Sequence, residues 1–290
     1  MSVLPGSSPY AGRRICLTTL HGKEQALARP FALGLGANLV VSTCDTDRLG
    51  TFSGERERPA DALETCRRKA LLGLERTGLT IGVASEGSFG PHPAAPLLPV
   101  GMELLLFLDR ERDLTVVERR LELRTNFAQL RLVADADPTT WLRQVGFPAH
   151  AVIARPAGQA AAVGALPFKG LTTAAQLSAA LQRCRAADPE ATVLLETDMR
   201  AHLNPTRMRS IRRLGCALVR RLGSPCPRCA SPGWGLVETR PGLPCRWCGT
   251  PTQLTAVEVK GCVRCGCQTE HGRRDGLAAA DPVHCDRCNP

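Results

Sequence analysis

Residues 226–229 read CPRC, and the same Cys-x-x-Cys pattern returns as CRWC at 245–248, CVRC at 262–265 and CDRC at 285–288. In chain order the pairs read C-x2-C-x15-C-x2-C and then C-x2-C-x19-C-x2-C, and both spacings are typical of four-thiolate zinc sites. Two intervening residues allow one tight turn to direct both sulfurs at a single tetrahedral ion. The sequence therefore predicts two structural Zn²⁺ ions, held by Cys226, Cys229, Cys245, Cys248, Cys262, Cys265, Cys285 and Cys288.

Two other uses of clustered cysteines agree less well with this sequence. A disulfide framework needs an oxidising compartment, and the first residues, MSVLPGSSPYAGRR, lack the apolar segment of a secretory signal. Iron–sulfur ligation usually shows tighter cysteine runs than two separated pairs. We therefore expect zinc and a cytoplasmic location.

The spacing leaves open which pairs share an ion. Two consecutive ribbons, in which the first pair faces the second and the third faces the fourth, are favoured over an interleaved arrangement. Cys267, His271 and His284 are spare donors that could replace a cysteine. A closed four-sulfur site has no open coordination position, so it is expected to stabilise the fold and to carry no reaction.

The remainder of the chain alternates strand-like and helix-like segments, a pattern typical of an α/β domain. Asn204 followed by Pro205 predicts the start of the last helix, and Gly223-Ser224-Pro225 ends it. We therefore expect an α/β domain over 11–222 and two zinc-ribbon modules over 223–290. The expected strands are 13–20, 38–44, 79–84, 102–109, 114–123, 149–155 and 191–196, and the expected helices are 23–37, 59–77, 172–187 and 205–222.

The last predicted helix has an apolar stripe formed by Met208, Ile211, Leu214, Leu218 and Leu222, which is expected to face the core. Four of its arginines are expected on other faces; they are Arg207, Arg212, Arg213 and Arg220. The five isolated cysteines are expected to pack as small hydrophobic side chains; these are Cys16, Cys44, Cys66, Cys184 and Cys216.

Charge is distributed unevenly along the chain. The formal net charge is +10, and from residue 201 onward 14 Arg and Lys stand against 6 Asp and Glu. Such a basic tail is compatible with nucleic-acid binding, and Trp234 and Trp247 between basic residues could stack on bases. Eight thiolates with two Zn²⁺ bring negative charge to the same tail, which weakens this interpretation. No apolar run is long enough to cross a membrane.

Three segments place polar residues where predicted strands meet loops, the usual location of α/β active sites. The first is Thr18-Thr19-Leu20-His21-Gly22-Lys23, where a helix N-terminus beside a lysine would bind an anion. A capping Thr with a solvated Lys is the structural alternative. The second comprises Asp45-Thr46-Asp47, Gly50-Thr51-Phe52 and residues 64–70, in which Glu64 and Arg68 could form a surface ion pair.

The third segment is Ala84-Ser85-Glu86-Gly87-Ser88-Phe89-Gly90-Pro91-His92-Pro93. It predicts a Gly/Ser turn after an apolar strand, in which Glu86 could bind Mg²⁺ or activate water. The structural alternative is a loop acid satisfied by backbone N–H groups. The segment ETDMRAH before the last helix adds Asp198, Arg200 and His202, which either complete a pocket or hold the connection through an Asp–Arg pair.

The runs ASEGSFGPHP and DMRAHLNPTRM, together with the terminal cysteine knuckles, resemble a family of bacterial proteins known only as a domain of unknown function. This resemblance covers nearly the whole chain and implies no activity. The order of motifs also resembles, more distantly, the inosine triphosphate pyrophosphatase superfamily. Those enzymes hydrolyse non-standard nucleoside triphosphates to monophosphate and pyrophosphate with Mg²⁺.

In that superfamily an early T-x-N-x-x-K turn contacts phosphate, and Thr18, Leu20 and Lys23 match its spacing without the Asn. Its G-x-T-F and E-N-A-x-x-K-A stretches resemble Gly50-Thr51-Phe52 and Glu64 to Ala70. The acidic D-D-S-G-L turn corresponds to Ser85-Glu86-Gly87-Ser88-Phe89, with one carboxylate fewer. The S-H-R-x-R-A-L helix resembles Pro205 to Ile211; its His is missing there, although His202 is close by.

The resemblance implies an inosine triphosphate pyrophosphatase-like mixed sheet and an electrostatic mechanism. Lys23, Lys69 and Arg207 would neutralise a triphosphate, and Glu64 with Glu86 would hold Mg²⁺. The residues expected to act in catalysis are thus Glu86, Glu64 and Lys69, and those expected to bind substrate are Thr18, Lys23, Arg200, His202 and Arg207.

Two functions follow from the sequence. One is a Mg²⁺-dependent nucleoside triphosphate pyrophosphatase-like or nucleotide-binding protein with a structural zinc-ribbon appendage. The other is a non-catalytic protein whose zinc ribbons bind nucleic acid or a protein partner. The ribbons could also cap or dimerise the α/β domain, so a homodimer is compatible with the sequence. The substrate stays open.

Overall fold

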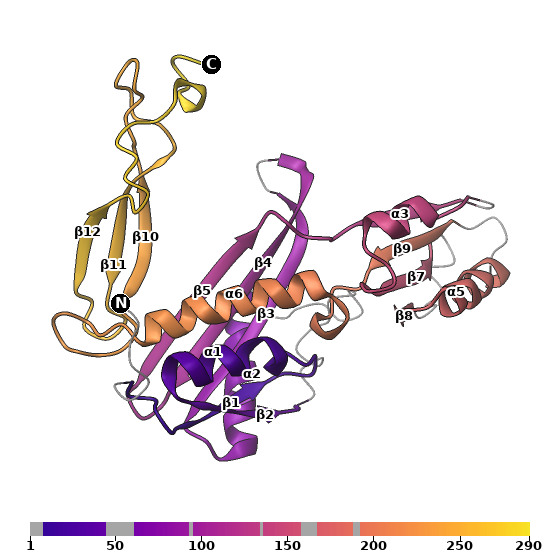
Figure 1. The fold of residues 1–290 in the computed structure, drawn as a ribbon, viewed down its shortest axis with the longest axis horizontal. Helices are drawn as coiled ribbons and strands as arrows, with labels where there is room; N and C mark the ends of the chain where they lie inside the picture. The colour runs from indigo at the N-terminus through magenta and orange to yellow at the C-terminus, as the bar shows by residue number, and fades with distance from the viewer. Residues whose placement is uncertain (1–7, 45–60, 93–94, 134–135, 158–166, 188–191) are drawn as a thin grey trace.

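The computed structural model describes residues 8–44, 61–92, 95–133, 136–157, 167–187 and 192–290. These residues form three separate β-sheets, of five, four and three strands. Figure 1 shows the five-stranded sheet with its helices in the middle of the molecule, the four-stranded sheet at one side and the three-stranded sheet rising as a narrow rod at the other. Among the described residues no helix is long and apolar enough to cross a membrane.

The central sheet has the strand order β2-β1-β3-β4-β5. Its strands are β1 (Arg14–Thr18), β2 (Asn38–Ser42), β3 (Ile81–His92), β4 (Ala95–Asp109) and β5 (Leu114–Glu122). Strand β1 runs parallel to β2 and to β3, whereas β3, β4 and β5 form an antiparallel meander. The expectation of an α/β domain with a mixed sheet is therefore confirmed.

Helices cover both faces of this sheet. Helices α1 (Glu24–Leu35) and α6 (Pro205–Leu222) pack on one face, and α2 (Ala62–Thr77) packs on the other. Residues alternate along each strand, so that Val83 of β3 and Leu105 of β4 meet α1 and α6, while Ala84 and Leu104 meet α2. This alternation decides on which face each polar side chain of the central strands lies.

Helix α6 begins as predicted. The Asn204 side chain accepts a hydrogen bond from the Arg207 backbone N–H at 3.0 Å, and Pro205 occupies the first turn. The predicted apolar stripe packs inward: Ile211, Leu214, Leu218 and Leu222 are buried, and Met208 packs against the same core. Arg207 is not part of the apolar stripe, as expected, but its side chain is buried against β4.

The four-stranded sheet forms a second hydrophobic core that the sequence analysis had not separated from the first. Its order is β6-β9-β7-β8, and its pairs are antiparallel. The strands β7 (Val152–Pro156) and β9 (Val193–Thr197) correspond to predicted strands. The unpredicted elements are β6 (Gln129–Leu132), β8 (Phe168–Leu171) and α3 (Thr139–Gln144), which are too short to carry a clear periodicity. Helix α5 (Ala174–Ala187) covers this sheet.

The three-stranded sheet carries the cysteine knuckles. Its strands β10 (Gly235–Pro241), β11 (Thr255–Gly261) and β12 (Gln268–Gly272) are antiparallel in this order. Short 3-10 turns lie at η3 (Ala201–Leu203) and η4 (Pro282–His284). Arg221, at the end of α6, joins the rod to the central sheet by donating to the Val117 carbonyl, the Glu118 carboxylate and the Gly233 carbonyl.

One predicted turn is a strand. The segment from Ser85 to His92 continues β3, and its residues pair in register with β4: Glu86 lies opposite Leu104 and Gly87 opposite Glu103. Glu86 is therefore in the middle of a strand and not in a Gly/Ser turn. Small residues weakened the strand pattern in the sequence, but the long antiparallel partner satisfies their backbone groups. The chosen domain boundaries, 11–222 and 223–290, stay a prediction.

Candidate functional site

The eight knuckle cysteines gather into two groups of four, Cys226, Cys229, Cys262 and Cys265, and Cys245, Cys248, Cys285 and Cys288. Within each group the ligand atoms lie within 4.8 Å of one another. The Sγ–Sγ distance is 3.8 Å for Cys226 and Cys265 and 3.6 Å for Cys248 and Cys285. Zn–S bonds of ~2.3 Å in a tetrahedron place sulfurs ~3.8 Å apart, so both groups fit structural Zn²⁺.

The Cys-x-x-Cys pairs combine in the interleaved arrangement. The sequence-based preference for two consecutive ribbons was therefore wrong. The first pair meets the third, and the second pair meets the fourth. The antiparallel pairing of β10 with β11 is the physical reason. Strand β10 leads from the first pair to the second, and β11 returns to the third, so pairs one and three share one end of the rod. The spacing of the cysteines along the sequence does not show that β11 runs back along β10.

The spare donors do not belong to either group. The backbone carbonyl of Cys267 accepts a hydrogen bond from Cys262 N–H at 2.9 Å, and the His271 ring lies 2.8 Å from the Thr269 hydroxyl. His284 lies in η4 directly before the ligand Cys285. Of the two tryptophans, Trp247 is 73% exposed, whereas Trp234 is half-buried.

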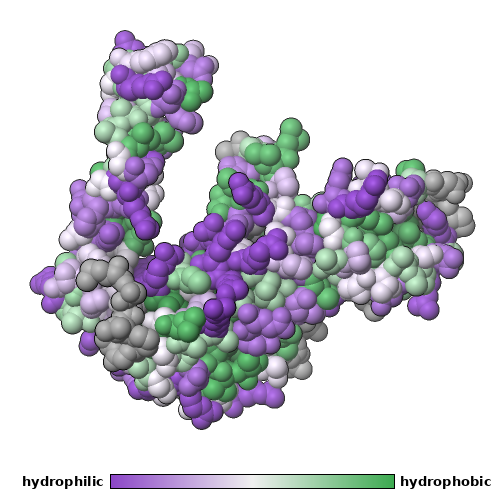
Figure 2. Space-filling model, viewed as in Figure 1, coloured by the Kyte–Doolittle hydropathy of each residue, from purple (hydrophilic) through white to green (hydrophobic). Residues whose placement is uncertain are grey.

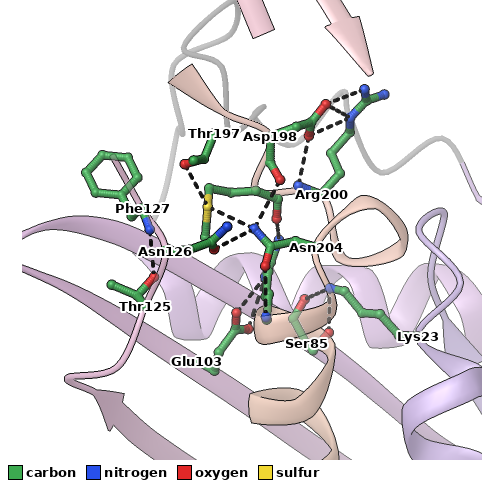
Figure 3. A network of polar contacts seen from close by, with 12 residues as sticks. Lys23, Ser85, Glu103, Thr125, Asn126, Phe127, Thr197, Asp198, Arg200 and Asn204 are labelled. Atoms are coloured by element: carbon green, nitrogen blue, oxygen red, sulfur yellow. Dashed lines mark hydrogen bonds and ion pairs between the residues drawn. The ribbon is translucent and has the colours of Figure 1, made fainter. Parts of the chain in front are cut away.

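A second group of functional side chains lies inside the central domain, on the face covered by α1 and α6. Arg207 Nε of α6 lies 2.6 Å from Glu103 Oε1 of β4, and both side chains are almost fully buried. The Arg207 guanidinium also donates to the Met199 carbonyl and lies over the Phe89 ring. The contacts to Glu103 and Met199 connect β4 to the segment before α6, and Figure 3 shows Glu103 close to Asn204 of that segment.

Gly87 makes room for this ion pair. A Cβ added at Gly87 would lie 2.6 Å from an Arg207 guanidinium nitrogen and 2.8 Å from a Glu103 carboxylate oxygen. Any side chain at this position would therefore displace the pair. A shallow pocket between the strands and α6 reaches the same place; it is lined by Phe89, Glu103, Glu122, Arg124, Thr125, Thr206, Arg207 and Ser210.

Lys23 is buried at the N-terminus of α1. Its Nζ donates to Ser85 Oγ at 2.7 Å and reaches the Ser85 carbonyl at 3.5 Å, as Figure 3 shows. Burial, followed by the charge of Arg207, lowers the pKa of Lys23 to about 8, although Glu103 and Glu86 oppose this effect. The register of β1 with β3 ends at Thr18 opposite Ala84, one residue before Ser85, so Lys23 meets β3 just beyond the end of β1.

Glu86 lies on the opposite face of the sheet. It forms an ion pair with Lys69 of α2, and the two side chains are 3% and 13% exposed. Strand alternation turns Glu86 toward α2 and leaves Glu103 to partner Arg207. The Glu86 charge also contributes to the raised pKa of the neighbouring Cys66, after burial as the main cause.

The strand-to-helix turn after β1 carries two histidines that stack. The rings of His21 and His202 lie with centroids 5.3 Å apart. Burial lowers the pKa of His21 to about 3, and the charges of Lys23, His202, Arg207 and Arg200 add to the effect. The pKa of His202 is also lowered, chiefly by burial and then by Arg200. Both rings are therefore neutral near pH 7 in a region of positive potential.

Asp198 fixes the segment that connects β9 of the four-stranded sheet to α6 of the central domain. Its carboxylate accepts from the Arg200 guanidinium at 2.6 Å and from the Gly170 backbone N–H at 3.1 Å. Asn204 donates to the Asn126 side chain at 2.9 Å and to the Asp198 carbonyl at 3.2 Å. Figure 3 shows Asn126, Asp198, Arg200 and Asn204 as one network. Of the two predicted roles of this segment, the structure shows the connection held by an Asp–Arg pair.

Lys23 and Arg207 thus lie on one face of the sheet, and Lys69 and Glu86 lie on the other, with the charges of Arg207, Glu86 and Lys69 all acting on the pKa of Lys23. His202 stacks on His21, and the charge of Arg200 acts on both histidines. Thr18 is buried beneath α2, where a Cβ at Gly73 would collide with its hydroxyl. Glu64 lies apart from the buried cluster: its half-exposed carboxylate pairs with Arg68 at 2.8 Å. Asp45-Thr46-Asp47 and Gly50-Thr51-Phe52 lie outside the described residues.

Sequence reasoning missed Ser85 as a partner of Lys23 and Glu103 as a partner of Arg207. The sequence could have indicated that Glu103 has a partner. It is the single acidic residue in the apolar run MELLLFL, and a charge buried in such a strand needs a partner of opposite charge. The predicted Mg²⁺ site receives no support from the described residues. Glu64 and Glu86 each pair with a cation, and the two cysteine groups are the described clusters of three or more metal-binding side chains.

The comparisons with known proteins agree with the first resemblance. Residues 69–290 match the family described as domain of unknown function DUF6671. The chain belongs to this family. The match includes both cysteine groups, Lys69, Glu86, Glu103 and Arg207, whereas Lys23 and the turn after β1 precede it. No curated protein and no solved structure matches this DUF6671 chain, and the pyrophosphatase resemblance is not confirmed.

Six cysteines lie outside the zinc groups, namely Cys267 and the five isolated cysteines that precede the knuckles. Cys16, Cys44, Cys66 and Cys184 are buried as expected, and burial raises the pKa of Cys16, Cys66 and Cys184. Cys216 contradicts the expectation, because it is exposed on α6. In the sequence it lies between the stripe residues Leu214 and Leu218, but its side chain is on the exposed side of the helix.

Proposed function

We propose that the central domain binds the phosphate groups of a nucleotide at the carboxyl end of β1. The observation that carries this proposal is the buried cation Lys23 at the end of β1, whose pKa is lowered by Arg207 on the same face of the sheet and by Lys69 on the other face. The stacked rings of His21 and His202 lie beside this turn. Ligands of open α/β sheets bind in this location, beyond the carboxyl ends of the strands. The N-terminus of α1 lies there as well, and its backbone N–H groups favour anions.

The charges of the cluster support an anion as the ligand. Four cationic side chains, Lys23, Lys69, Arg200 and Arg207, stand against three carboxylates, Glu86, Glu103 and Asp198. The excess of one positive charge agrees with the lowered pKa of His21 and Lys23. A bound phosphate would supply the missing negative charge and would raise the pKa of both groups.

The reaction class implied by the pyrophosphatase resemblance is hydrolysis of a nucleoside triphosphate to monophosphate and pyrophosphate. In that reaction the buried cations would stabilise negative charge on the phosphates. Glu64 and Glu86 each pair with a cationic side chain, so nucleotide binding is the part of this proposal that the buried cations support.

A nucleotide panel tests the proposal. Full-length zinc-loaded protein is heated with nucleoside mono-, di- and triphosphates, with and without Mg²⁺ or Mn²⁺, and pyrophosphate release is measured in parallel. We expect at least one nucleotide to raise the Tm, because a ligand that binds only the folded state stabilises it. Lys23→Met should abolish this increase, whereas Arg76→Gln on the exposed side of α2 should preserve it. The absence of any shift and of any turnover across the panel rejects the proposal.

A further inference from the structure

The solvent face of α6 carries a row of arginines without acidic partners. Arg209, Arg212, Arg213 and Arg220 are all exposed. Arg209 donates to the Thr206 hydroxyl at 3.0 Å, and Arg220 donates to the Cys216 carbonyl at 3.2 Å. Within the described ranges none of the four forms an ion pair. Neighbouring basic side chains do, as Arg207 with Glu103 and Arg221 with Glu118 show.

These arginines form a continuous stripe because of their spacing. Arg209, Arg213, Cys216 and Arg220 follow one another at intervals of three or four residues, which places them on one side of the helix. Arg212 lies next to them. At 1.5 Å per residue the stripe from Arg209 to Arg220 is ~16 Å long. Figure 2 shows hydrophilic side chains gathered over α6, between the zinc rod and the hairpin of β3 and β4.

The stripe is held rigidly. The opposite side of α6 contributes Ile211, Leu214, Leu218 and Leu222 to the core of the central domain. Its C-terminal end is fixed through Arg221, which contacts β5 and the base of the zinc rod. A rigid row of guanidinium groups loses little conformational entropy in the backbone when it binds an extended anion.

We propose that this face of α6 binds the phosphodiester backbone of a nucleic acid. Guanidinium groups bind phosphate oxygens with directed, charge-assisted hydrogen bonds, and a backbone presents such groups at regular intervals along its length. A membrane surface is disfavoured, since a helix that binds lipid inserts an apolar face, and the apolar face of α6 is buried in the protein core. Contacts to phosphate carry no sequence information, so the proposed binding is expected to be independent of base sequence.

This site is distinct from the cysteine tail to which the sequence analysis assigned nucleic-acid binding. The stripe lies entirely before Gly223, and its charge is not reduced by zinc-bound thiolates. It is also separate from the proposed nucleotide site, because its side chains point into solvent while Lys23 and Arg207 are buried. Either proposal can therefore fail without the other.

Fluorescence anisotropy with the full-length zinc-loaded protein tests the proposal. The probes are labelled DNA and RNA of mixed sequence, single-stranded and double-stranded, titrated at several salt concentrations. Four phosphate contacts predict a slope of log K against log salt of about −3.6 for a duplex and about −2.8 for a single strand. The probe with the higher affinity identifies the physiological class of nucleic acid.

Matched double variants locate the binding surface. R212Q/R213Q removes two contacts, so the slope for a duplex should become shallower by about 1.8. R67Q/R76Q removes the same charge from exposed positions of α2, on the opposite side of the sheet, and should leave the slope unchanged. Both variants should retain the wild-type Tm within about 2 °C, because surface substitutions change stability little.

The exposed Cys216 thiol provides an independent measurement. It lies within the stripe, so bound nucleic acid should slow its alkylation by a maleimide, as followed by peptide mass spectrometry. Three results would overturn the proposal: no binding to any probe at 50 mM salt, an equal loss of slope in both double variants, or competition by polyglutamate as strong as that by unlabelled nucleic acid. The last result would assign the stripe to an acidic protein.

Discussion

Glu103 of β4 and Arg207 of α6 form an ion pair whose side chains are 1% and 0% exposed. The pair joins the middle of the central sheet to the first turn of the helix that covers it. Arg207 also contacts the Met199 carbonyl and the Phe89 ring, so its charge is satisfied from several sides. Since a charge buried without such partners is very unfavourable, the first turn of α6 and β4 are bound to one relative position.

Removing one member of this pair should destabilise the protein strongly. Glu103→Ala leaves the Arg207 charge buried without its carboxylate, and we expect a loss of ~3–5 kcal/mol in the free energy of unfolding, measured by urea denaturation. Glu64→Ala, in the exposed pair with Arg68, should cost less than ~1 kcal/mol. The double variant E103L/R207M should recover much of the loss. Equal effects of E103A and E64A would show that the buried pair has no special role.

The interleaved zinc arrangement predicts which double variants lose one ion and which lose two. C226S/C262S changes two ligands of one group, and C226S/C245S changes one ligand in each group. Metal analysis of the purified proteins should give about one Zn²⁺ per chain for C226S/C262S and none for C226S/C245S, because a structural site needs its four ligands. Consecutive ribbons would give the reverse result for these two variants.

The fold could be predicted from the sequence where elements are long or flanked by clear signals. Helix α6 has a capping Asn204, Pro205 in the first turn and a regular apolar stripe, and its bounds agree with the structure. The short strands β6 and β8 contain four residues each and lacked such signals. The extension of β3 through Gly87 and Gly90 was also missed, because only its pairing with β4 makes these glycines part of a strand.

The sequence predicted several of the charged residues in the candidate site, but not which of them form ion pairs with one another. The charges of Arg207, Glu86 and Lys69 act on the pKa of Lys23, but these three side chains belong to two ion pairs on opposite faces of the sheet. Their pairing depends on the face of the sheet on which each side chain lies, and that face was hidden by the wrong assignment of residues 85–92 to a turn. For the same reason the interleaved zinc sites could not be derived, since they follow from the return of β11 along β10.

Close contact between α2 and β1 makes Gly73 intolerant of any side chain. A Cβ at this position would collide with the Thr18 hydroxyl and lie 2.8 Å from Cys16 Sγ. Alanine would favour the helix by ~1 kcal/mol, but the collision should outweigh this gain, so we expect Gly73→Ala to lower the Tm. Gly78→Ala is a poor control because of its left-handed backbone. The double variant T18A/G73A, which removes the colliding hydroxyl, should regain part of the loss, and a Tm of G73A above wild type would contradict this packing.

The stacked histidines predict a loss of stability in mild acid. The pKa of His21 is lowered from 6.5 to about 3, so between these values the unfolded state binds a proton that the folded state excludes. Stability is therefore fully present above pH 6.5 and falls as the pH decreases below it. His21→Phe keeps a ring against His202 without a titrating nitrogen, and its unfolding free energy should fall less between pH 7.5 and pH 5.

The decrease should not vanish in this variant, because the pKa of His202 is lowered as well. Urea denaturation at half-unit pH steps measures the difference between the two proteins, and working above pH 5 limits protonation of the zinc-bound thiolates. His271→Phe, at an exposed position of β12, is the matched control and should follow the wild-type profile. Parallel pH profiles for wild type and His21→Phe would show that His21 accepts a proton as readily in the folded as in the unfolded chain, which would contradict its burial beside Lys23 and Arg207.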